Sequence, residues 1–218
     1  RGILSYAHQN ILYVDEINLL DDAIVNVILD AAAQGYYTVR RGAVVSAYHS
    51  RFVLIGSMNP EEGQLRPQIM DRLGLRVVVS GLKDPQERLE VYRRVKAFQE
   101  NPHAFVAAFA EETAALTAEI IHARELLPQV ALSQEAEEKA LHLVRELQID
   151  SHRAEITIFE AARAHAAADG RTEATVEDVQ AVAPLALRQR RSEYIIHYLE
   201  RSQQEDEEIA KAIERVCG

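Results

Sequence analysis

The sequence predicts a mixed fold in which part of a parallel α/β sheet is followed by an all-α region. In the first eighty residues, short apolar runs rich in strand formers alternate with a helical pattern. Polar residues follow two of these runs directly, as they do at the carboxyl ends of parallel strands. From Asp84 onward the composition changes to Ala, Glu, Leu, Arg and Gln at helical spacing. We therefore place a domain boundary at residues 82–83.

The first part is predicted to contain three buried strands, one long helix and one hairpin. The helix in "DDAIVNVILDAAAQG" (21–35) has Asp21 or Asp22 as its N-cap and Gly35 as its stop signal. The hairpin covers 36–48 and turns near Arg41 and Gly42. A short helix precedes the third strand. The strands are predicted in "ILYV" (11–14), "RFVLIGSMNP" (51–60) and "LRVVVS" (75–80).

The second part is predicted to be entirely helical. Asp84 and Asn101 are each followed by proline, a pairing typical of a helix N-cap and the first helical position. The segment that begins at Asn101 reads as one helix as far as residue 127. Further helices are predicted to begin at Ser133, His152 and Thr175, and the tail reads as one long charged helix over 188–218.

Composition excludes several classes of protein. The net charge of −10 argues against nonspecific binding to nucleic acid and to anionic membranes. The single cysteine, Cys217, excludes a disulfide framework and is typical of a reducing compartment. The apolar runs are too short to span a membrane. The eight histidines are scattered without metal-ligand spacing, so we predict no zinc site.

Chemistry is expected at the ends of the first two strands. Asp15 and Glu16 follow "ILYV", where one carboxylate could hold a hydrated Mg²⁺ and the other could orient an attacking water. Asn59 ends the next strand with an amide that can bind a water or a phosphate oxygen. From these residues alone, turn and capping roles are equally good interpretations. For Arg66 and Arg72 a surface ion pair is the simpler interpretation.

Taken together, five segments resemble the ATPase subunit of magnesium chelatase, a branch of the AAA+ family. The resemblance runs in order from about Gly2 to about Arg191, and its longest motif is specific to that branch and its near relatives. The segments are "ILYVDEINLLDD", "VNVILDAAAQGYYTVRR", "RFVLIGSMNPEEGQLRPQIMDRLGL", "LLPQV" and "GRTEATVEDV".

The resemblance implies a role for each candidate residue. Asp15 and Glu16 match the Walker B pair, with Asp15 as the Mg²⁺ ligand and Glu16 as the residue that activates water. Asn59 matches sensor 1, which reads the γ-phosphate of ATP. Arg72 matches the arginine finger, which reaches the ATP site of the adjacent subunit. Arg153 matches sensor 2, which brings the helical lid onto the nucleotide.

The resemblance also implies an architecture. Residues 1–82 would be the C-terminal part of an AAA+ P-loop-type parallel sheet, running from Walker B to the arginine finger and the last strand. Residues 83–187 would be the helical linker and the lid, and 188–218 a charged C-terminal helix. The 36–48 hairpin matches an insertion before the sensor 1 strand, and the helices of 84–127 match the branch's connection between core and lid.

The function implied is that of a motor subunit using ATP and Mg²⁺. The family forms homo-oligomeric rings, usually hexamers, that drive a second AAA+ subunit with an adhesion domain and a porphyrin-binding catalytic subunit. That complex inserts Mg²⁺ into protoporphyrin IX, a step of chlorophyll and bacteriochlorophyll biosynthesis and hence of photosynthesis. We expect no nucleic-acid partner, no membrane span, and a location in the cytoplasm or, in a phototrophic eukaryote, the plastid stroma.

The sequence departs from the family at one essential motif. It contains no G-x-x-x-x-G-K-[ST] segment, and only fourteen residues precede Asp15. In the AAA+ sheet order, the strand that leads into the G-x-x-x-x-G-K-[ST] loop lies between the sensor 1 strand and the last strand. That strand is missing from these residues. We therefore expect a gap in the sheet, a chain that is part of a longer ATPase, and no ATP hydrolysis by these residues alone. A rearranged sheet that closes the gap is the less favoured alternative.

Two other functions fit the same motifs. One is a related AAA+ ATPase with a different client, such as cobalt chelation or the remodelling of a partner protein. The other is a non-catalytic AAA+ module that serves as a scaffold in the ring. The presence of Asp15, Glu16, Asn59, Arg72 and Arg153 together argues against the scaffold.

Overall fold

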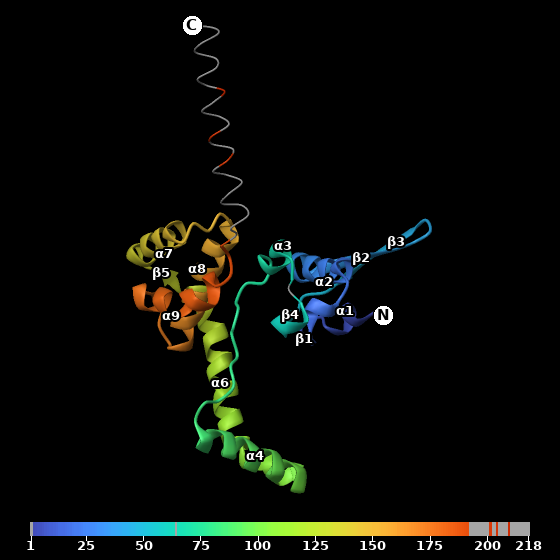
Figure 1. Cartoon of the computed structure of the whole chain (residues 1–218), viewed down its shortest axis with the longest axis vertical. Coiled ribbons are helices and arrows are strands. Elements are labelled where there is room, and N and C mark those ends of the chain that lie inside the picture. Colours follow the sequence, from blue (N-terminus) through green and yellow to red (C-terminus); the bar gives the residue numbers. More distant parts are fainter. Residues whose placement is uncertain (1, 64, 192–200, 202–203, 205–208, 210–218) are drawn as a thin grey trace. The chain divides into compact units, whose positions relative to one another are not determined.

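The computed structural model describes residues 2–63, 65–191, 201, 204 and 209, and the chain packs as two compact units, 1–73 and 74–218. The first unit is mixed α/β (Figure 1). Its elements are α1 (Ile3–Tyr6), β1 (Ile11–Val14), η1 (Ile17–Leu19), α2 (Asp22–Gln34), β2 (Tyr36–Arg41), β3 (Val44–His49), β4 (Val53–Gly56), η2 (Pro60–Glu62) and α3 (Pro67–Met70).

Strands β1 and β4 form a parallel pair in which Val14 lies opposite Gly56. This confirms two of the three predicted strands and their parallel arrangement. Their predicted full burial is wrong, because side chains alternate between the two faces of a strand. Val14 packs into the core with α2, whereas Ile11 and Tyr13 point away and are 62% and 59% exposed. Within the described residues of this unit, the face that carries Val14 is the one that packs in the core.

Helix α2 covers that face and confirms the predicted helix. The carboxylate of Asp21 accepts a hydrogen bond from the backbone N–H of Ala23 at 2.8 Å, which caps the first turn. Gly35 ends the helix in the left-handed conformation at φ 75°, which glycine adopts at little cost. The small core of this unit gathers around the helix and consists of Ile17, Val25, Leu29, Leu65 and Ile69.

The predicted hairpin is confirmed as the antiparallel pair β2–β3. Tyr36 lies opposite His49, and the register continues to the turn at Gly42, which has φ 60°. The rings of Tyr37 and Tyr48 stack across the strands with centroids 5.5 Å apart. The hairpin extends beyond α2 (Figure 1).

The predicted third strand, over 75–80, is wrong. Within the described part of the chain this segment is extended but pairs with no strand, and Val77, Val78 and Val79 are 69%, 60% and 89% exposed. A run of strand formers needs a neighbouring strand for its backbone groups. Here the backbone N–H of Arg76 donates instead to the carbonyl of Leu185, at 2.9 Å. The segment therefore belongs to the second unit, whereas the predicted domain boundary at 82–83 stays a prediction.

Over the described residues 85–187, the second unit is mostly helical. Asp84 and Asn101 cap their helices as predicted, and Ser133, where a helix was predicted to begin, caps its helix too. Each side chain accepts from a backbone N–H of the first turn. Its elements are α4 (Pro85–Glu100), α5 (Pro102–Ala108), α6 (Ala110–Leu126), η3 (Leu127–Gln129), β5 (Ala131–Leu132), α7 (Gln134–Glu146), α8 (His152–Ala168), β6 (Glu173–Ala174) and α9 (Val176–Leu187).

The single helix predicted from Asn101 to residue 127 is wrong, because α5 and α6 are separate helices that meet at Phe109. The backbone N–H of Phe109 closes a tight turn onto the carbonyl of Val106, at 3.2 Å. Its ring packs against Phe105 with centroids 5.1 Å apart. Aromatic packing at the break compensates for the interrupted helical hydrogen bonds.

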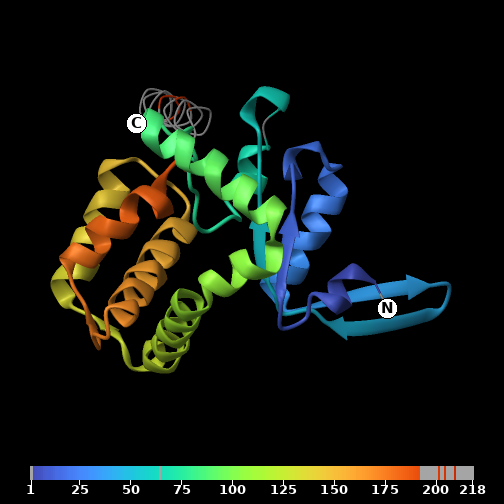
Figure 2. The same ribbon diagram turned by 90° about the horizontal axis from the view of Figure 1, so that it is seen from below.

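Helices α7, α8 and α9 pack together around an alanine-rich core (Figures 1 and 2). Small side chains let the helices approach closely, as at Ala162 and Ala166, which are fully buried. The two-residue strands β5 and β6 pair in parallel beside them. Arg163 of α8 donates to the carbonyls of Val130 and Leu127, at 2.9 and 3.2 Å, and so fixes the "LLPQV" turn.

The predicted tail helix lies largely outside the described residues. In the part of the chain that the structure describes, no helix combines the length and apolar character needed to cross a bilayer.

Candidate functional site

Four polar residues follow β1 and β4 where the two strands end, and we call Asp15, Glu16, Ser57 and Asn59 the strand-end site. The parallel register brings the residue after Val14 beside the residue after Gly56. The carboxylate of Asp15 accepts from the hydroxyl of Ser57 at 2.5 Å and from that of Tyr13 at 2.9 Å, both at Oδ1. The Ser57 hydroxyl, and then that of Tyr13, lowers the pKa of the Asp15 carboxyl below its ordinary value.

Glu16 follows in an unusual backbone conformation. Its φ of 48° and ψ of 52° are left-handed, which costs a residue with a Cβ about 1 kcal/mol. Its backbone N–H donates to the Ser57 hydroxyl at 2.9 Å. The next amide, that of Ile17, donates to the Ser57 carbonyl at 3.0 Å. The turn presents the Glu16 carboxylate to solvent at the edge of the sheet.

Asn59 lies two residues beyond Ser57 and caps η2. Its side-chain oxygen accepts from the N–H of Glu61 at 3.2 Å, so the capping role weighed from sequence is present. Asn18 donates to the carbonyls of Asn59 and Gly63 at 3.4 and 3.3 Å, which ties the turn after Glu16 to the turn of Asn59. Among the described residues, the side-chain oxygen of Asn18 is buried without a hydrogen-bond partner. The sensor 1 role of Asn59 stays a prediction.

Arg66 and Arg72 both pair with carboxylates of α2. Arg72 contacts Asp30 at 2.5 Å, and Arg66 contacts Asp22 at 2.6 Å. The Arg72 side chain is 34% exposed and that of Asp30 51%, so this is a surface ion pair. The structure therefore contains the simpler interaction weighed from sequence, and the arginine-finger role stays a prediction.

Arg153 belongs to the second unit. It lies in the first turn of α8, where its side chain is exposed and its carbonyl accepts from the Thr157 hydroxyl at 2.6 Å. The structure thus joins Asp15 and the Glu16 backbone through Ser57, and Asn18 ties the turn of Asn59 to the turn that follows Glu16. The sensor 2 role of Arg153 is not part of that geometry and stays a prediction.

Sequence reasoning missed Ser57, Tyr13 and Asn18. A signal for Ser57 was available, because two adjacent parallel strands of equal length place the residues after them side by side. Tyr13 is two residues before Asp15 and therefore on the same face of the strand. Asn18 could not be found from pattern, because its partners are backbone carbonyls brought near by folding.

The site suits Mg²⁺ better than it suits a whole nucleotide. The Asp15 carboxylate is a hard oxygen ligand at the surface, and both of its hydrogen bonds end on Oδ1, so Oδ2 can hold a hydrated cation. The β- and γ-phosphates of ATP need a cradle of backbone N–H groups. The 218 residues contain no G-x-x-x-x-G-K-[ST] segment that could form one.

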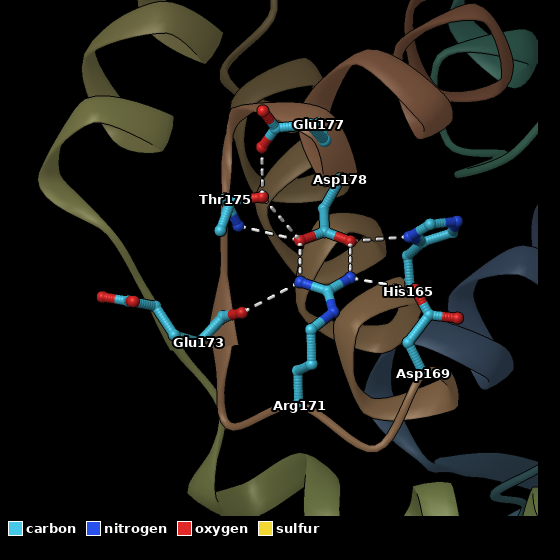
Figure 3. A network of polar contacts seen from close by, with 7 residues as sticks. All are labelled: His165, Asp169, Arg171, Glu173, Thr175, Glu177 and Asp178. Carbon is cyan, nitrogen blue, oxygen red and sulfur yellow. Dashed lines mark hydrogen bonds and ion pairs between the residues drawn. The ribbon is translucent and has the colours of Figure 1, made fainter.

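A second polar cluster lies in the other unit (Figure 3). His165, Asp169 and Asp178 lie close enough together to share a metal ion, but Arg171 occupies the centre. The Arg171 guanidinium donates to both oxygens of Asp178, at 2.5 and 2.7 Å, and to Asp169 at 3.0 Å. Arg171 neutralises the charge of both carboxylates in this network.

Asp178 is the buried member of that cluster. Its side chain is 1% exposed, and His165 and the backbone N–H of Thr175 also bond to it, at 2.6 and 2.8 Å. The Arg171 guanidinium holds the pKa of the Asp178 carboxyl well below its ordinary value, against the opposing effect of burial. In turn Asp178, and then Asp169, raises the pKa of Arg171. The cluster fixes the "GRTEATVEDV" segment at the start of α9.

Two family profiles match separate segments of the chain. The family described as "Magnesium chelatase, subunit ChlI" matches residues 1–72, which include the whole strand-end site, and "AAA lid domain" matches residues 137–213. The chain belongs to the magnesium chelatase family of AAA+ proteins. This confirms the resemblance and the AAA+ fold expected from the motifs.

Individual relatives agree. A "Magnesium-chelatase subunit ChlI homolog" of Methanocaldococcus jannaschii is 51% identical over 85% of this chain and 51% of its own length. "Magnesium-chelatase subunit ChlI" of Synechocystis is 44% identical over 87% of this chain and 53% of its own length. "Magnesium-chelatase 38 kDa subunit" of Chlorobaculum parvum is 39% identical over 97% of this chain and 61% of its own length. The chain spans about half the length of the curated relatives it matches.

A solved structure supports the fold alone. A crystal structure from Cytophaga hutchinsonii, described provisionally as an ATPase, aligns with a TM-score of 0.61 at 22% identity. The alignment covers 83% of this chain and 58% of that one.

Proposed function

We propose that the chain supplies the Walker B, sensor 1 and lid portions of an ATPase motor subunit in a magnesium-chelatase-type complex. The observation that carries the proposal is the strand-end site, in which Asp15 and Glu16 leave one parallel strand beside the Asn59 turn that follows its neighbour. In open parallel sheets, ligands bind at this edge. Family membership favours ATP as the ligand.

Each residue has a distinct task in this proposal. Asp15 holds hydrated Mg²⁺ through the oxygen that Ser57 and Tyr13 leave available. Mg²⁺, when bound, neutralises charge that develops on the phosphates. Glu16 orients the attacking water and accepts its proton. Asn59 donates its side-chain N–H to the γ-phosphate while its oxygen keeps the cap on η2.

Arg72 acts in a neighbouring subunit. In the single chain Asp30 holds its guanidinium on α2, so assembly has to exchange that carboxylate for a phosphate of the adjacent site. An exposed ion pair is weak enough for this exchange. An arginine finger supplied by a neighbour makes hydrolysis depend on the ring, which we propose to be a hexamer. Arg153 would act from the lid as sensor 2, coupling the nucleotide state to the lid angle.

The partners follow from the family. The ring would drive a second AAA+ subunit with an adhesion domain and a porphyrin-binding catalytic subunit, with Mg²⁺ and protoporphyrin IX as that subunit's substrates. The cytoplasm, or the plastid stroma, is the expected location. The 218 residues alone lack a phosphate cradle, so we propose that they do not hydrolyse ATP without one.

A mixing experiment tests the arrangement. We define the fusion ATPase as this chain placed behind an AAA+ strand that carries a G-x-x-x-x-G-K-[ST] loop. Arg72→Ala subunits should be about a thousandfold slower or worse, and Glu16→Gln subunits about a hundredfold slower or worse. Mixing the two inactive variants should restore activity, because a Glu16→Gln subunit donates its Arg72 to the intact site of an Arg72→Ala neighbour. No recovery in rings shown to be mixed would contradict a finger supplied by the neighbour.

A second candidate is a related AAA+ ATPase with another client. The Methanocaldococcus jannaschii relative, named only as a homolog, is more similar to this chain than the Synechocystis subunit is, at 51% against 44% identity. The same core motifs serve both readings, because only the client differs. Mg²⁺ insertion into protoporphyrin IX, assayed with the fusion ATPase and the two partner subunits, distinguishes them: insertion supports the first function, and ATPase activity without insertion supports the second.

A further inference from the structure

The hydroxyl of Ser57 contacts both acids of the strand-end site. It donates to Asp15 Oδ1 at 2.5 Å and accepts from the backbone N–H of Glu16 at 2.9 Å. A serine hydroxyl has one donor and two acceptor positions, so both bonds form at once. One small side chain directly after β4 therefore bonds to the two successive residues that follow β1.

These two bonds differ in kind from the backbone contacts around them. The Ser57 N–H donates to the carbonyl of Val14, and its carbonyl accepts from the N–H of Ile17, both at 3.0 Å. Those backbone bonds hold the strand ends together whichever side chain occupies position 57. Among the described residues, the hydroxyl bonds only to Asp15 and Glu16, and it is therefore not needed to pair the strand ends.

Glu16 needs such a contact more than its neighbours do. Its left-handed backbone at φ 48° is strained for a residue with a Cβ, and strain of this kind persists where surrounding contacts enforce it. The Ser57 hydroxyl satisfies the amide of this strained residue, and the same hydroxyl fixes which Asp15 oxygen is bound within the protein.

We propose that Ser57 is a positioning residue for the Asp15–Glu16 pair, holding the Asp15 carboxylate in one orientation and the Glu16 backbone in its left-handed turn. The catalytic importance of Ser57 rests on the proposed function, whereas its hydrogen bonds to Asp15 and Glu16 do not depend on that proposal. Ser57 lies two residues before Asn59 on the same chain segment. Any movement of that segment when Asn59 meets a phosphate therefore reaches both acids through one hydroxyl.

Amide hydrogen exchange on the 218-residue chain tests the contact directly. In the Ser57→Ala variant, the Glu16 amide should exchange at least tenfold faster, as followed by NMR. The amides of Ile17 and Ser57 should stay protected, because their partners are backbone carbonyls. Ser57→Thr, which keeps the hydroxyl, should retain the slow exchange of Glu16. Tyr13→Phe is the matched control, because it removes the other bond to Asp15 and has no bond to the Glu16 amide.

Each other outcome overturns the proposal. Unchanged Glu16 exchange in Ser57→Ala would mean that the hydroxyl does not hold the turn. Equal acceleration at Glu16, Ile17 and Ser57 would mean that Ser57 only keeps the strands together. Failure of Ser57→Thr to protect Glu16 would exclude the hydroxyl as the cause.

A second measurement connects the contact to function. In the fusion ATPase, Ser57→Ala should raise the Mg²⁺ concentration at half-maximal rate about tenfold, and Ser57→Thr should bring it back. An unchanged Mg²⁺ requirement would overturn the positioning role. If instead Glu16→Gln left ATP hydrolysis intact while Ser57→Ala still released the Glu16 amide, the proposed function would fail and the positioning of the pair would stand.

Discussion

Asp15 and Asp178 are both aspartates whose carboxyl pKa is lowered by hydrogen bonds, yet they occupy opposite environments. Asp178 is 1% exposed, and Arg171, His165 and Thr175 together engage both of its oxygens. Asp15 lies at the surface, and Ser57 and Tyr13 engage one oxygen only. A carboxylate with every acceptor position filled stabilises a fold, whereas one held on a single side remains able to bind a cation.

The largest expected effect on stability is at the buried carboxylate. Asp178→Asn removes the charge that Arg171 faces and should destabilise the second unit by about 3 kcal/mol. Exchange mass spectrometry of α8 and α9 peptides in increasing urea measures this. Asp169→Asn, at a side chain 57% exposed, is the matched control and should cost less than about 1 kcal/mol. Equal losses of stability from the two substitutions would contradict a special structural role for the buried Asp178 carboxylate.

Asp15→Asn sharpens the contrast from the other side. It should lower the urea midpoint of the first unit only slightly, because the carboxylate lies at the surface and the Asn oxygen can still accept from Ser57 and Tyr13. Hydrogen-exchange mass spectrometry of the peptides that cover α2, in increasing urea, measures this midpoint. A loss as large as that of Asp178→Asn would mean that the two carboxylates do the same work.

The comparison also predicts a pH dependence. The pKa of Asp178 is depressed in the folded protein, so the unfolded chain binds more protons in acid. Its contribution to stability is therefore present above the ordinary aspartate pKa of about 4 and is lost as the pH falls below it. The stability difference between wild type and Asp178→Asn should shrink between pH 5 and about pH 2 in urea titrations. A constant difference over that range would contradict the assignment.

In the first unit, backbone geometry should matter more than the acids. Gly35→Ala places a Cβ at φ 75°, 3.0 Å from the Arg51 side chain, and should cost about 1–2 kcal/mol. Gly42→Ala, at φ 60° with open space around it, isolates the backbone strain and should cost about 1 kcal/mol. Urea midpoints of α2 peptides give both values, and a costlier Gly42 variant would contradict the role of the Arg51 contact.

A small effect on stability is expected at Arg72 in the single chain. Arg72→Ala breaks an exposed ion pair with Asp30 and should change the stability of the single chain by less than about 1 kcal/mol. The same substitution should nearly abolish hydrolysis in the assembled fusion ATPase. A loss of several kcal/mol in the single chain would assign Arg72 a structural task.

Local patterns predicted most of the fold. The caps at Asp21, Asp84 and Ser133 and the Gly35 stop signal depend on a few adjacent residues, so they are readable in the sequence. The strand predicted at 75–80 failed because pairing depends on a neighbour, which propensity does not report. The prediction of one continuous helix across Phe109 failed because the segment is rich in alanine, which favours helix throughout. The turn depends on the packing of Phe109 against Phe105.

The same division applies to the site. Asp15, Glu16 and Asn59 were found because each lies at the carboxyl end of a predicted strand. Ser57 was missed because its role appears only with the β1–β4 register. The role of Asp178 was missed, because its bond to His165 joins two helices. Sequence showed which residues could act, and packing showed which of them are held in place and by what.

The most direct test of the account is the ATP hydrolysis rate of Glu16→Gln in the fusion ATPase, measured beside its ATP binding. We predict a rate about a hundredfold to ten-thousandfold lower, with ATP binding retained and with Asp169→Asn as an active control. A Glu16→Gln protein that binds and hydrolyses ATP like wild type would show that the strand-end site is not where water is activated.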